Sequence, residues 1–305
     1  MKIGVPKALL FHRYEPYIKI FFDNLNEDIV YSGPTNRVIL EKGINNCVDE
    51  ACLPIKVFQG HVTKLLEECD KVVVPRIMKC EFGDSICPKF AGLPELIGKG
   101  DNTHDRFIFT NPLYLNDKKK LKMMLVTEGK RLGIRKHDVM NAFNKASKTR
   151  VSPYIIKDSA EQKKKCFGRV MILGHPYNIY DNFVNMNMAE KLKSMGVEVI
   201  YGDSLDFDKK LKFSKKLIKE PYWMFYRENL WKAITAVEGA KADGIIYISS
   251  FCCGTDSITI DMIKDKIGGF PMLVIKLDEH TGEVGVDTRL EAFVELLERR
   301  KGRKI

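Results

Sequence analysis

Residues 168–202 read GRVMILGHPYNIYDNFVNMNMAEKLKSMGVEVIYG, and this stretch decides the fold class. It begins with a short apolar segment, GRVMILG, which predicts a buried strand that ends at a Gly/Pro turn. The segment from 181 to 196 has the apolar spacing of an amphipathic helix, and VEVIYG at 197–202 predicts a second strand. A strand, a helix and a strand in this order form a βαβ unit, whose two strands pair in parallel.

The same alternation continues on both sides of this stretch. Toward the C-terminus, DGIIYISS at 243–250 and PMLVIKLD at 271–278 predict further strands, each followed by a helix. Toward the N-terminus, KIGVPKALL at 2–10 and DKVVVPRI at 70–77 predict buried strands, again with helical segments between them. We therefore expect an α/β protein of two Rossmann-like lobes, each built on a parallel sheet.

The length of the chain agrees with two lobes. It has 305 residues, and a domain typically has ~100–200. Residues 117–150 predict two helices without a strand between them, and the stretch 151–168 that follows is polar and contains Pro153. We expect an N-terminal α/β lobe over 1–150, a linker over 151–168 and a C-terminal α/β lobe over 169–305.

The composition predicts a folded protein of the cytoplasm. The chain is 45% hydrophobic, which is enough for a packed core and excludes general disorder. No apolar run approaches the ~18 residues of a membrane helix. The start, MKIGVPKALLFHRYEP, has neither a long apolar core nor a small-residue cleavage site, so it does not resemble a secretory signal. We expect a cytoplasmic protein with no membrane partner.

The net charge of +10 raises the question of nucleic-acid binding, because excess Lys and Arg attract phosphate. The basic residues, however, are mixed with acidic ones, as in LLEECDK at 65–71 and VELLERRKGRK at 294–304. No helix-turn-helix, zinc-finger or aromatic RNA-binding signature is present. We therefore do not expect a nucleic-acid partner.

Eight cysteines carry the chemistry of the sequence. Thiols of a reducing compartment that cluster in sequence are more often metal ligands or catalytic groups than disulfides. Two of the eight, Cys69 and Cys166, lie outside turns, and we expect them to be small buried hydrophobes. The other six form three pairs in loops or at helix starts: Cys47 with Cys52, Cys80 with Cys87, and Cys252 with Cys253.

The positions and spacings of the pairs indicate a metal site. Loops that follow strands lie at the edge of an open α/β sheet where ligands bind. The spacings are C-x4-C, C-x6-C and CC, whereas compact zinc sites use C-x(2–4)-C pairs. Iron–sulfur clusters accept thiolates from widely separated loops, so the spacing favours iron–sulfur over zinc and leaves a structural zinc site as an alternative.

Six stretches carry a resemblance to a known family. The chain resembles the family related to 2-hydroxyacyl-CoA dehydratases and their activases, specifically its stand-alone, activase-related members. By motif, the resemblance implies that Cys52, Cys87 and Cys253 are the cluster ligands. The stretches follow one another along most of the chain: IGVPKALLFHRYEPY at 3–17, DEACLPIKVFQGHV at 49–62, ICPKFAGLPEL at 86–96, GHPYNIYD at 174–181, FCCGTDS at 251–257 and LDEHTGEVGVDTRLEAF at 277–293.

The resemblance also implies the type of cluster. Related dehydratase subunits carry an oxygen-sensitive [4Fe–4S] cluster with three cysteine ligands and one open iron, and we expect such a cluster in the cleft between the lobes. A subfamily carries a double-cubane [8Fe–9S] cluster with six cysteines. In this chain Cys47, Cys80 and Cys252 are the candidates for three additional ligands, so the double cubane remains the alternative.

Low-potential electron transfer is the activity that the resemblance implies. The sequence has no G-x-x-x-x-G-K-[ST] loop and no G-x-G-x-x-G fingerprint, so ATP hydrolysis falls to a separate activase that delivers electrons. We expect a reductase or electron-transfer component that acts on a small molecule of unknown identity, with a second copy of the chain as a candidate partner in a homodimer. The alternatives are a non-catalytic cluster carrier or scaffold and a structural zinc protein.

Two residues after the last predicted strand are candidates for catalysis. His280 follows PMLVIKL and could donate a proton to a reduced intermediate, because histidine titrates near neutral pH. Glu283 could orient His280 or bind a ligand. His175 and Tyr177, in the turn GHPYN, are further candidates, although a tight turn alone explains much of that motif. Arg76 is a candidate for binding an anion.

Overall fold

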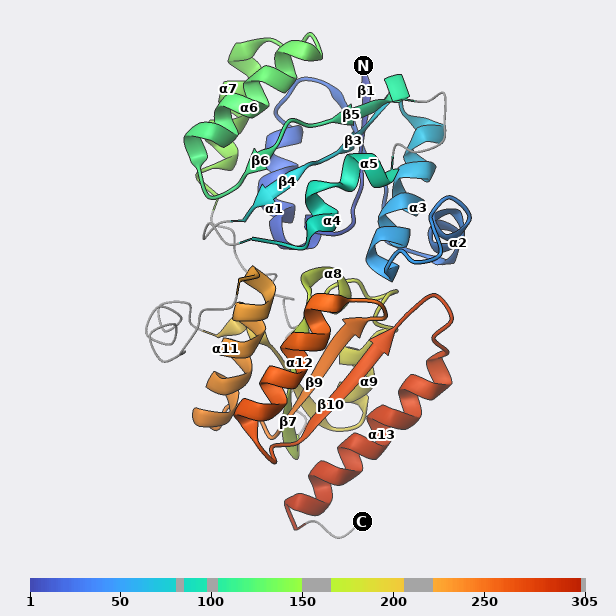
Figure 1. Cartoon of the computed structure of the whole chain (residues 1–305), viewed down its shortest axis with the longest axis vertical. Helices are drawn as coiled ribbons and strands as arrows, with labels where there is room; N and C mark the ends of the chain where they lie inside the picture. The colour runs from blue at the N-terminus through green and yellow to red at the C-terminus, as the bar shows by residue number, and fades with distance from the viewer. Residues whose placement is uncertain (81–84, 98–103, 150–165, 206–221, 303–305) are drawn as a thin grey trace. The chain divides into compact units, whose positions relative to one another are not determined.

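The structure is a computed structural model that describes residues 1–80, 85–97, 104–149, 166–205 and 222–302. The chain divides into two compact units (Figure 1). The first is Met1–Ser152 with Tyr222–Met224, and the second is Pro153–Pro221 with Phe225–Ile305. Most of the predicted linker, 151–168, lies outside the described residues, which resume at Cys166.

The first unit contains a parallel sheet with the strand order β2-β1-β3-β5. Its strands are β1 (Lys2–Val5), β2 (Asp28–Tyr31), β3 (Lys71–Val74) and β5 (Phe107–Phe109). Two short strands, β4 (Ile77–Lys79) and β6 (Leu113–Tyr114), pair in parallel as a separate ribbon. The helices are α1 (Phe11–Phe22), α2 (Arg37–Asn45), α3 (Leu53–Glu68), α4 (Pro88–Ala91), α5 (Leu93–Ile97), α6 (Lys118–Arg131) and α7 (Lys136–Ala146), and His104–Arg106 form a 3-10 turn.

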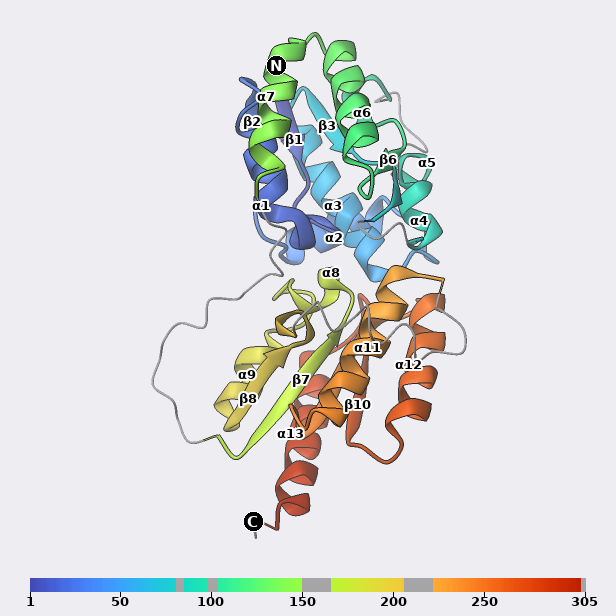
Figure 2. The same cartoon turned by 90° about the vertical axis from the view of Figure 1, so that its left-hand side faces the viewer.

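Alternation along β1 assigns the helices to the two faces of this sheet. Ile3 joins the apolar core with Phe21 of α1 and Phe143 of α7, whereas the next residue, Gly4, faces Leu65 of α3. Successive residues of a strand point to opposite faces, so α1, α6 and α7 cover one face and α3 covers the other (Figure 2).

Helix α2 packs directly on α3 through two glycines. A Cβ on Gly43 would lie 1.9 Å from the carbonyl oxygen of Lys56, and a Cβ on Gly60 would lie 1.9 Å from that of Ile39. Only residues without a side chain allow this backbone approach. Because α3 begins at Leu53, the close contact holds the loop that contains Cys47 and Cys52 against the start of α3.

The second unit contains a parallel sheet with the strand order β10-β9-β7-β8. Its strands are β7 (Gly168–Gly174), β8 (Val197–Tyr201), β9 (Gly244–Ser250) and β10 (Met272–Leu277). The helices are α8 (Pro176–Ile179), α9 (Met188–Ser194), α11 (Met224–Glu238), α12 (Gly254–Ile267) and α13 (Glu283–Arg300), and Gly202–Ser204 form a 3-10 turn.

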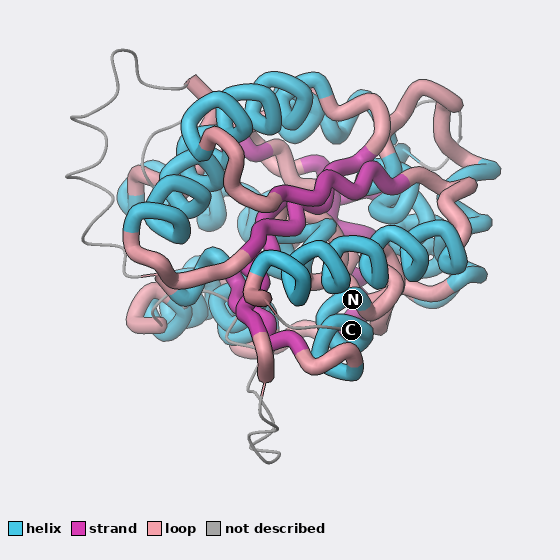
Figure 3. Tube along the Cα trace, turned by 90° about the horizontal axis from the view of Figure 1, so that it is seen from below, coloured by secondary structure: helices cyan, strands magenta, loops and turns pink. Residues whose placement is uncertain are grey.

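The core of the second unit lies on both faces of its sheet. Tyr247 of β9 is fully buried against α11 and α12. On the other face a Cβ at Gly244 would lie 2.8 Å from the ring of Phe293, so α13 packs there. Figure 3 shows helices on both sides of the strands of this sheet. The α/β class with two parallel sheets, predicted from the alternation of the sequence, is confirmed.

One predicted helix is shorter than expected. The sequence predicts a helix over 181–196, but α9 begins only at Met188. The Asp181 carboxylate accepts hydrogen bonds from the backbone N–H groups of Phe183 and Val184, and Asn187 has a left-handed backbone with φ of 55°. Asp side chains that bond to the backbone in this way stabilise turns at the expense of helix. No helix in the described part of the chain is long and apolar enough to span a membrane.

Candidate functional site

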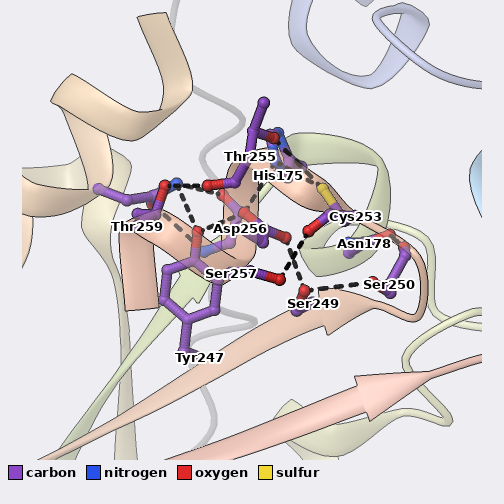
Figure 4. Close-up of polar contacts among 12 residues, drawn as sticks. His175, Asn178, Tyr247, Ser249, Ser250, Cys253, Thr255, Asp256, Ser257 and Thr259 are labelled. Atoms are coloured by element: carbon purple, nitrogen blue, oxygen red, sulfur yellow. Dashed lines mark hydrogen bonds and ion pairs between the residues drawn. The ribbon is translucent and has the colours of Figure 1, made fainter. Parts of the chain in front are cut away.

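The candidate site of the second unit lies at the carboxyl edge of its sheet, where the strands β7 and β9 end. Each strand leads into a helix, and His175 and Cys253 are the N-cap residues of α8 and α12 (Figure 4). The Sγ atom of Cys253 lies 3.9 Å from Nε2 of His175. Asp256 completes a group of three potential ligand atoms that lie within 4.8 Å of one another. This edge is where open α/β sheets bind ligands.

Gly174 explains why the histidine reaches this edge. Its φ is +144°, and a Cβ there would lie 2.3 Å from the carbonyl oxygen of Ile248. Any other residue would therefore push β7 away from β9. The side chain of Asn229 accepts from the backbone N–H of Gly174 at 3.3 Å and donates to its carbonyl oxygen at 3.2 Å. The motif GHPYN is thus a constrained turn that presents His175 beside Cys253.

Asp256 is a buried carboxylate that accepts hydrogen bonds from three side chains. It is 2% exposed and accepts hydrogen bonds from Tyr247 at 2.7 Å, Ser249 at 2.8 Å and His175 at 2.9 Å. Burial alone would raise the pKa of the Asp256 carboxyl, but the His175 imidazole and the two hydroxyls outweigh it and hold the pKa below its usual value. Asp256 is therefore an anion that fixes the position of His175.

The carboxylate of Asp256 favours the protonated, cationic form of His175. Burial lowers the pKa of His175, but Asp256 and Cys253 more than offset this effect and raise the pKa to about 10. The ring stacks on Tyr177 with centroids 5.1 Å apart and meets the edge of Phe225 at 4.8 Å. Its Nδ1 atom is buried and has no hydrogen-bond partner among the described residues.

Several groups that favour negative charge converge on Cys253. Its Sγ lies 3.3 Å from the hydroxyl of Thr255 and within reach of the His175 imidazole. Cys253 also precedes the first turn of α12, a helix of 14 residues whose N-terminus carries partial positive charge. The surroundings of this sulfur therefore consist of a helix N-terminus, a hydroxyl and the His175 imidazole.

Further hydrogen bonds connect the ends of β7 and β9. Ser250 donates to the side-chain oxygen of Asn178 at 3.0 Å. Asn178 is fully buried, and its side-chain nitrogen has no hydrogen-bond partner in the described part of the chain. Buried polar atoms are nearly always satisfied, so this nitrogen and Nδ1 of His175 are two exceptions among the described residues.

The first unit also presents cysteines at helix starts. Cys52 is the N-cap of α3 and Cys87 the N-cap of α4, and the next helical positions include Pro54 and Pro88. Proline is favoured there because its missing N–H needs no partner. The thiols of Cys52, Cys87 and Cys253 thus share one local position.

Cys47 lies near Cys52. Burial raises the pKa of the Cys47 thiol above its usual value, and the nearby Cys52 acts in the same direction. Lys56 and Lys89 lie close enough to oppose this rise in pKa. The first unit therefore gathers two thiols and two ammonium groups at the start of α3, and Lys89 follows Cys87 by two residues.

The remaining cysteines differ in environment. Cys80 is fully buried, whereas Cys252 is exposed and has a left-handed backbone with φ of 60°. Cys69, the C-cap of α3, is buried as predicted. The prediction that Cys166 is buried is wrong: it is exposed, because it precedes β7 and the neighbouring Phe167 takes the buried position.

His280 and Glu283 lie outside the group formed by His175. The side chain of His280 is 88% exposed, with Nε2 3.9 Å from Glu279. Glu283 begins α13 and forms an ion pair with Lys191 at 2.6 Å. Their catalytic roles stay predictions.

Arg76 is engaged within the first unit. Its guanidinium pairs with both carboxylate oxygens of Glu95 and donates to the carbonyl oxygen of Ala91 at 2.7 Å. Its predicted role as an anion-binding group would therefore require it to leave these partners.

Sequence reasoning gave no role to Asp256, Tyr247 or Ser249. A signal for all three exists. Asp256 follows Cys253 by three residues, a spacing that brings side chains to one face of a helix. Tyr247 and Ser249 alternate along β9 and therefore share a face of the sheet. Polar residues on the buried face of a strand indicate a hydrogen-bond network.

The group of His175, Cys253 and Asp256 could hold a metal ion only after rearrangement. Asp256 already accepts three hydrogen bonds, and Nε2 of His175 donates one of them. A protonated Nε2 has no lone pair for a metal. As arranged, the two residues support the Cys253 thiol rather than compete with it for an ion.

A family model described as the CoA enzyme activase uncharacterised domain matches residues 2–205. The chain belongs to this family. The match supports the expected activase- and dehydratase-related family at this coarser level, and it includes Cys52, Cys87 and His175 but ends before Cys253. No curated protein matches this member of the family.

Among solved structures, this activase-domain protein is similar to the glutamate racemase isoform RacE1 from Bacillus anthracis. The two are 12% identical over 99% of this chain and 82% of the racemase chain, with a TM-score of 0.21. A similarity at this level carries no argument about fold or activity.

Proposed function

We propose that this protein is an iron–sulfur reductase or electron-transfer component that receives electrons from a separate, ATP-hydrolysing activase. The observation that carries the proposal is the shared position of Cys52, Cys87 and Cys253, each of which is the N-cap of a helix. Helix N-termini favour thiolates, and thiolates are the ligands of iron–sulfur clusters.

The donor set fits a [4Fe–4S] cluster. Cys52, Cys87 and Cys253 would hold it, and it would supply one-electron transfer at low potential. Thr255 acts on this ligand set through a hydrogen bond to the sulfur of Cys253, and His175 acts on it through its positive charge 3.9 Å from that sulfur, because hydrogen bonds and charges near cysteine sulfur tune the potential of a cluster. Asp256 orients His175 and keeps its Nε2 proton in place.

Membership in the activase-domain family supports the partner in this proposal. The sequence has no phosphate-binding loop of the G-x-x-x-x-G-K-[ST] type, and we assign the nucleotide chemistry to a separate activase. The substrate of the proposed reductase is a small molecule whose identity the site does not specify.

The double cubane with six cysteines is the alternative form of the same proposal. The proximity of Cys47 and Cys52 supports it. The exposed, left-handed Cys252 beside the half-buried Cys253 opposes it, because the two neighbouring thiols have different surroundings. We favour the simple cube.

A mononuclear zinc site is a second candidate, since the ligand atoms of His175, Cys253 and Asp256 lie within 4.8 Å. It requires Asp256 to give up hydrogen bonds from two buried hydroxyls and from His175. Losing these bonds leaves polar groups unsatisfied, at a cost of about 1–3 kcal/mol each. We therefore rank zinc below the cluster.

The experiment that tests the activity uses the full chain isolated without oxygen. Titanium(III) citrate reduces the sample and is then removed by anaerobic gel filtration, and electron paramagnetic resonance follows the cluster signal before and after addition of oxidised benzyl viologen. The proposal predicts a cluster signal that appears on reduction and disappears as the viologen turns violet. A signal that persists beside oxidised viologen would identify a carrier or scaffold instead.

A further inference from the structure

The first unit contains a cavity of about 560 Å³ that the proposed redox chemistry does not use. Its volume lies in the range of about 300–1,000 Å³ of small-molecule sites. The wall is formed almost entirely by apolar side chains, among them Phe22, Phe58, Leu125 and Phe143. Binding sites in proteins are typically apolar with few polar groups, so this cavity has the chemistry of a ligand site.

The position of the cavity in the fold agrees with a ligand site. Val5 ends β1, Pro75 follows β3 and Thr110 follows β5, and all three line the cavity. The cavity therefore opens on the carboxyl edge of the first sheet, where α/β proteins bind ligands. Residues of α1, α6 and α7 line much of the wall, and Phe58 of α3 and Phe90 of α4 also contribute.

The backbone of the wall departs from regular structure. Leu9 lines the cavity with φ of +54°, a left-handed conformation that costs a non-glycine residue about 1–2 kcal/mol. Tyr14 interrupts α1 with φ of −113° and ψ of 15°, two residues before Pro16. Such irregularities concentrate at ligand sites.

One polar atom of the wall has no partner. The hydroxyl of Tyr17 is buried and makes no hydrogen bond to any described residue. Burial raises the pKa of Tyr17 to about 12, so the hydroxyl keeps its proton. A buried donor without an acceptor is rare in folded proteins, so Tyr17 marks a polar point in a mainly apolar wall.

The charged side chains that line the cavity are all positive. Lys118, at the start of α6, and Lys148, just after α7, are exposed and line the cavity. Neither forms an ion pair within the described residues. Ser147 and Thr149 add hydroxyls beside Lys148. A ligand that fits must therefore be apolar over most of its length and anionic at one end.

We propose that the first unit binds a linear aliphatic carboxylate, with its hydrocarbon chain in the cavity and its carboxylate at Lys118 and Lys148. Burial of the chain provides the affinity, and the two ammonium groups select for an acid. The site is independent of the cysteines and of the proposed electron transfer.

The test is a fluorescence titration of the full chain with cis-parinarate, a linear fatty acid that fluoresces in apolar surroundings. The proposal predicts saturable binding of about one probe per chain. Palmitate displaces the probe, whereas hexadecanol, with the same chain and no charge, displaces it at least about tenfold less well. Absence of saturable binding, or equal displacement by the alcohol, would overturn the proposal.

Two sets of variants place the probe in the cavity. Lys118→Glu with Lys148→Glu weakens binding about tenfold, since two attractive charges become repulsive. The control is Lys119→Glu with Lys136→Glu, which makes the same change of charge at exposed positions on α6 and α7 outside the lining. Equal effects of the two double variants would overturn the assignment of the head group.

Cavity filling tests the position of the chain. Ile18→Trp and Leu125→Trp each place an indole in the lining from a half-buried position, one from α1 and one from α6. Each variant weakens binding more than about tenfold if far-ultraviolet circular dichroism shows native helix content. Unchanged affinity in either folded variant would overturn the proposal, and the surface lysine variants decide the case if neither folds.

Discussion

Nε2 of His175 lies 2.9 Å from Oδ1 of Asp256, and both side chains are almost completely buried. His175 follows β7 and Asp256 lies in the first turn of α12, so the parallel pairing of β7 with β9 brings the two together. The carboxylate holds the imidazole against the sulfur of Cys253. This ion pair is the structural basis for the role that we assign to Cys253.

Removal of the carboxylate charge tests this ion pair. Asp256→Asn leaves His175 without its buried counter-ion, and breaking a buried pair costs about 3–5 kcal/mol of the free energy of unfolding. We expect a loss of about 3 kcal/mol, measured by urea denaturation of the metal-free chain, because the amide retains one acceptor. Asp265→Asn on the exposed side of α12 is the control and changes stability by less than about 0.5 kcal/mol. Equal effects of the two variants would show that the pair contributes nothing.

The ligand assignment predicts different outcomes for different cysteines. Cys52→Ser, Cys87→Ser and Cys253→Ser lose or convert the cluster, because each removes a thiolate at a helix start. Cys166→Ser keeps it, since this thiol is exposed and lies before β7. Iron content and the visible spectrum of anaerobic samples give the readout. A variant among the first three that keeps the wild-type iron content and spectrum contradicts the assignment of that residue.

The number of irons distinguishes the simple cube from the double cubane. We expect Cys47→Ser, Cys80→Ser and Cys252→Ser to keep the wild-type iron content, because three thiolates are sufficient for one [4Fe–4S] cluster. Iron analysis of each folded variant provides the measurement. Loss of about half of the iron in each of the three would replace the simple cube with a six-ligand site.

The buried histidine of α3 is expected to make the free energy of unfolding depend on pH. His61 of α3 is fully buried between Ser32 at 2.6 Å and Thr35 at 2.9 Å, and burial lowers its pKa to about 3. The unfolded chain binds the proton near the ordinary histidine pKa of 6.5, so the folded state loses stability as the pH falls from about 6.5 to about 3. Above pH 6.5 both states are neutral at this position and the effect is absent.

Substitution isolates this effect from the titration of other groups. His61→Gln flattens the pH dependence of the unfolding free energy between pH 6.5 and 4, measured by urea denaturation, whatever its effect at pH 8. His137→Gln is the control, because that side chain is 86% exposed. A wild-type slope in His61→Gln would mean that His61 takes up its proton in the folded chain.

The strands of the site could be predicted from the sequence, because β7 and β9 are short apolar runs bounded by Gly, Pro and polar residues. The helix starts at Cys52 and Cys253 could also be predicted, from Pro54 and from the strand that precedes Cys253. The hydrogen-bond partners of Asp256 could not be predicted from the sequence. Their meeting depends on which strands pair and in which register, and that is a tertiary property.

Two further features, the late start of α9 and the cavity of the first unit, could not be predicted because they depend on local interactions. The Asp181 side chain bonds to the backbone and delays α9, an effect that apolar spacing does not reveal. The cavity of the first unit depends on the irregular backbone at Leu9 and Tyr14, which no periodic pattern predicts.

The central claim is that thiolates of this chain hold an iron–sulfur cluster, and the most direct test is the metal content of the full chain purified without oxygen. Iron, acid-labile sulfide and zinc are measured on one sample. The account predicts about four iron atoms and a comparable amount of sulfide per chain, with a brown colour that bleaches in air. Stoichiometric zinc without sulfide would contradict it.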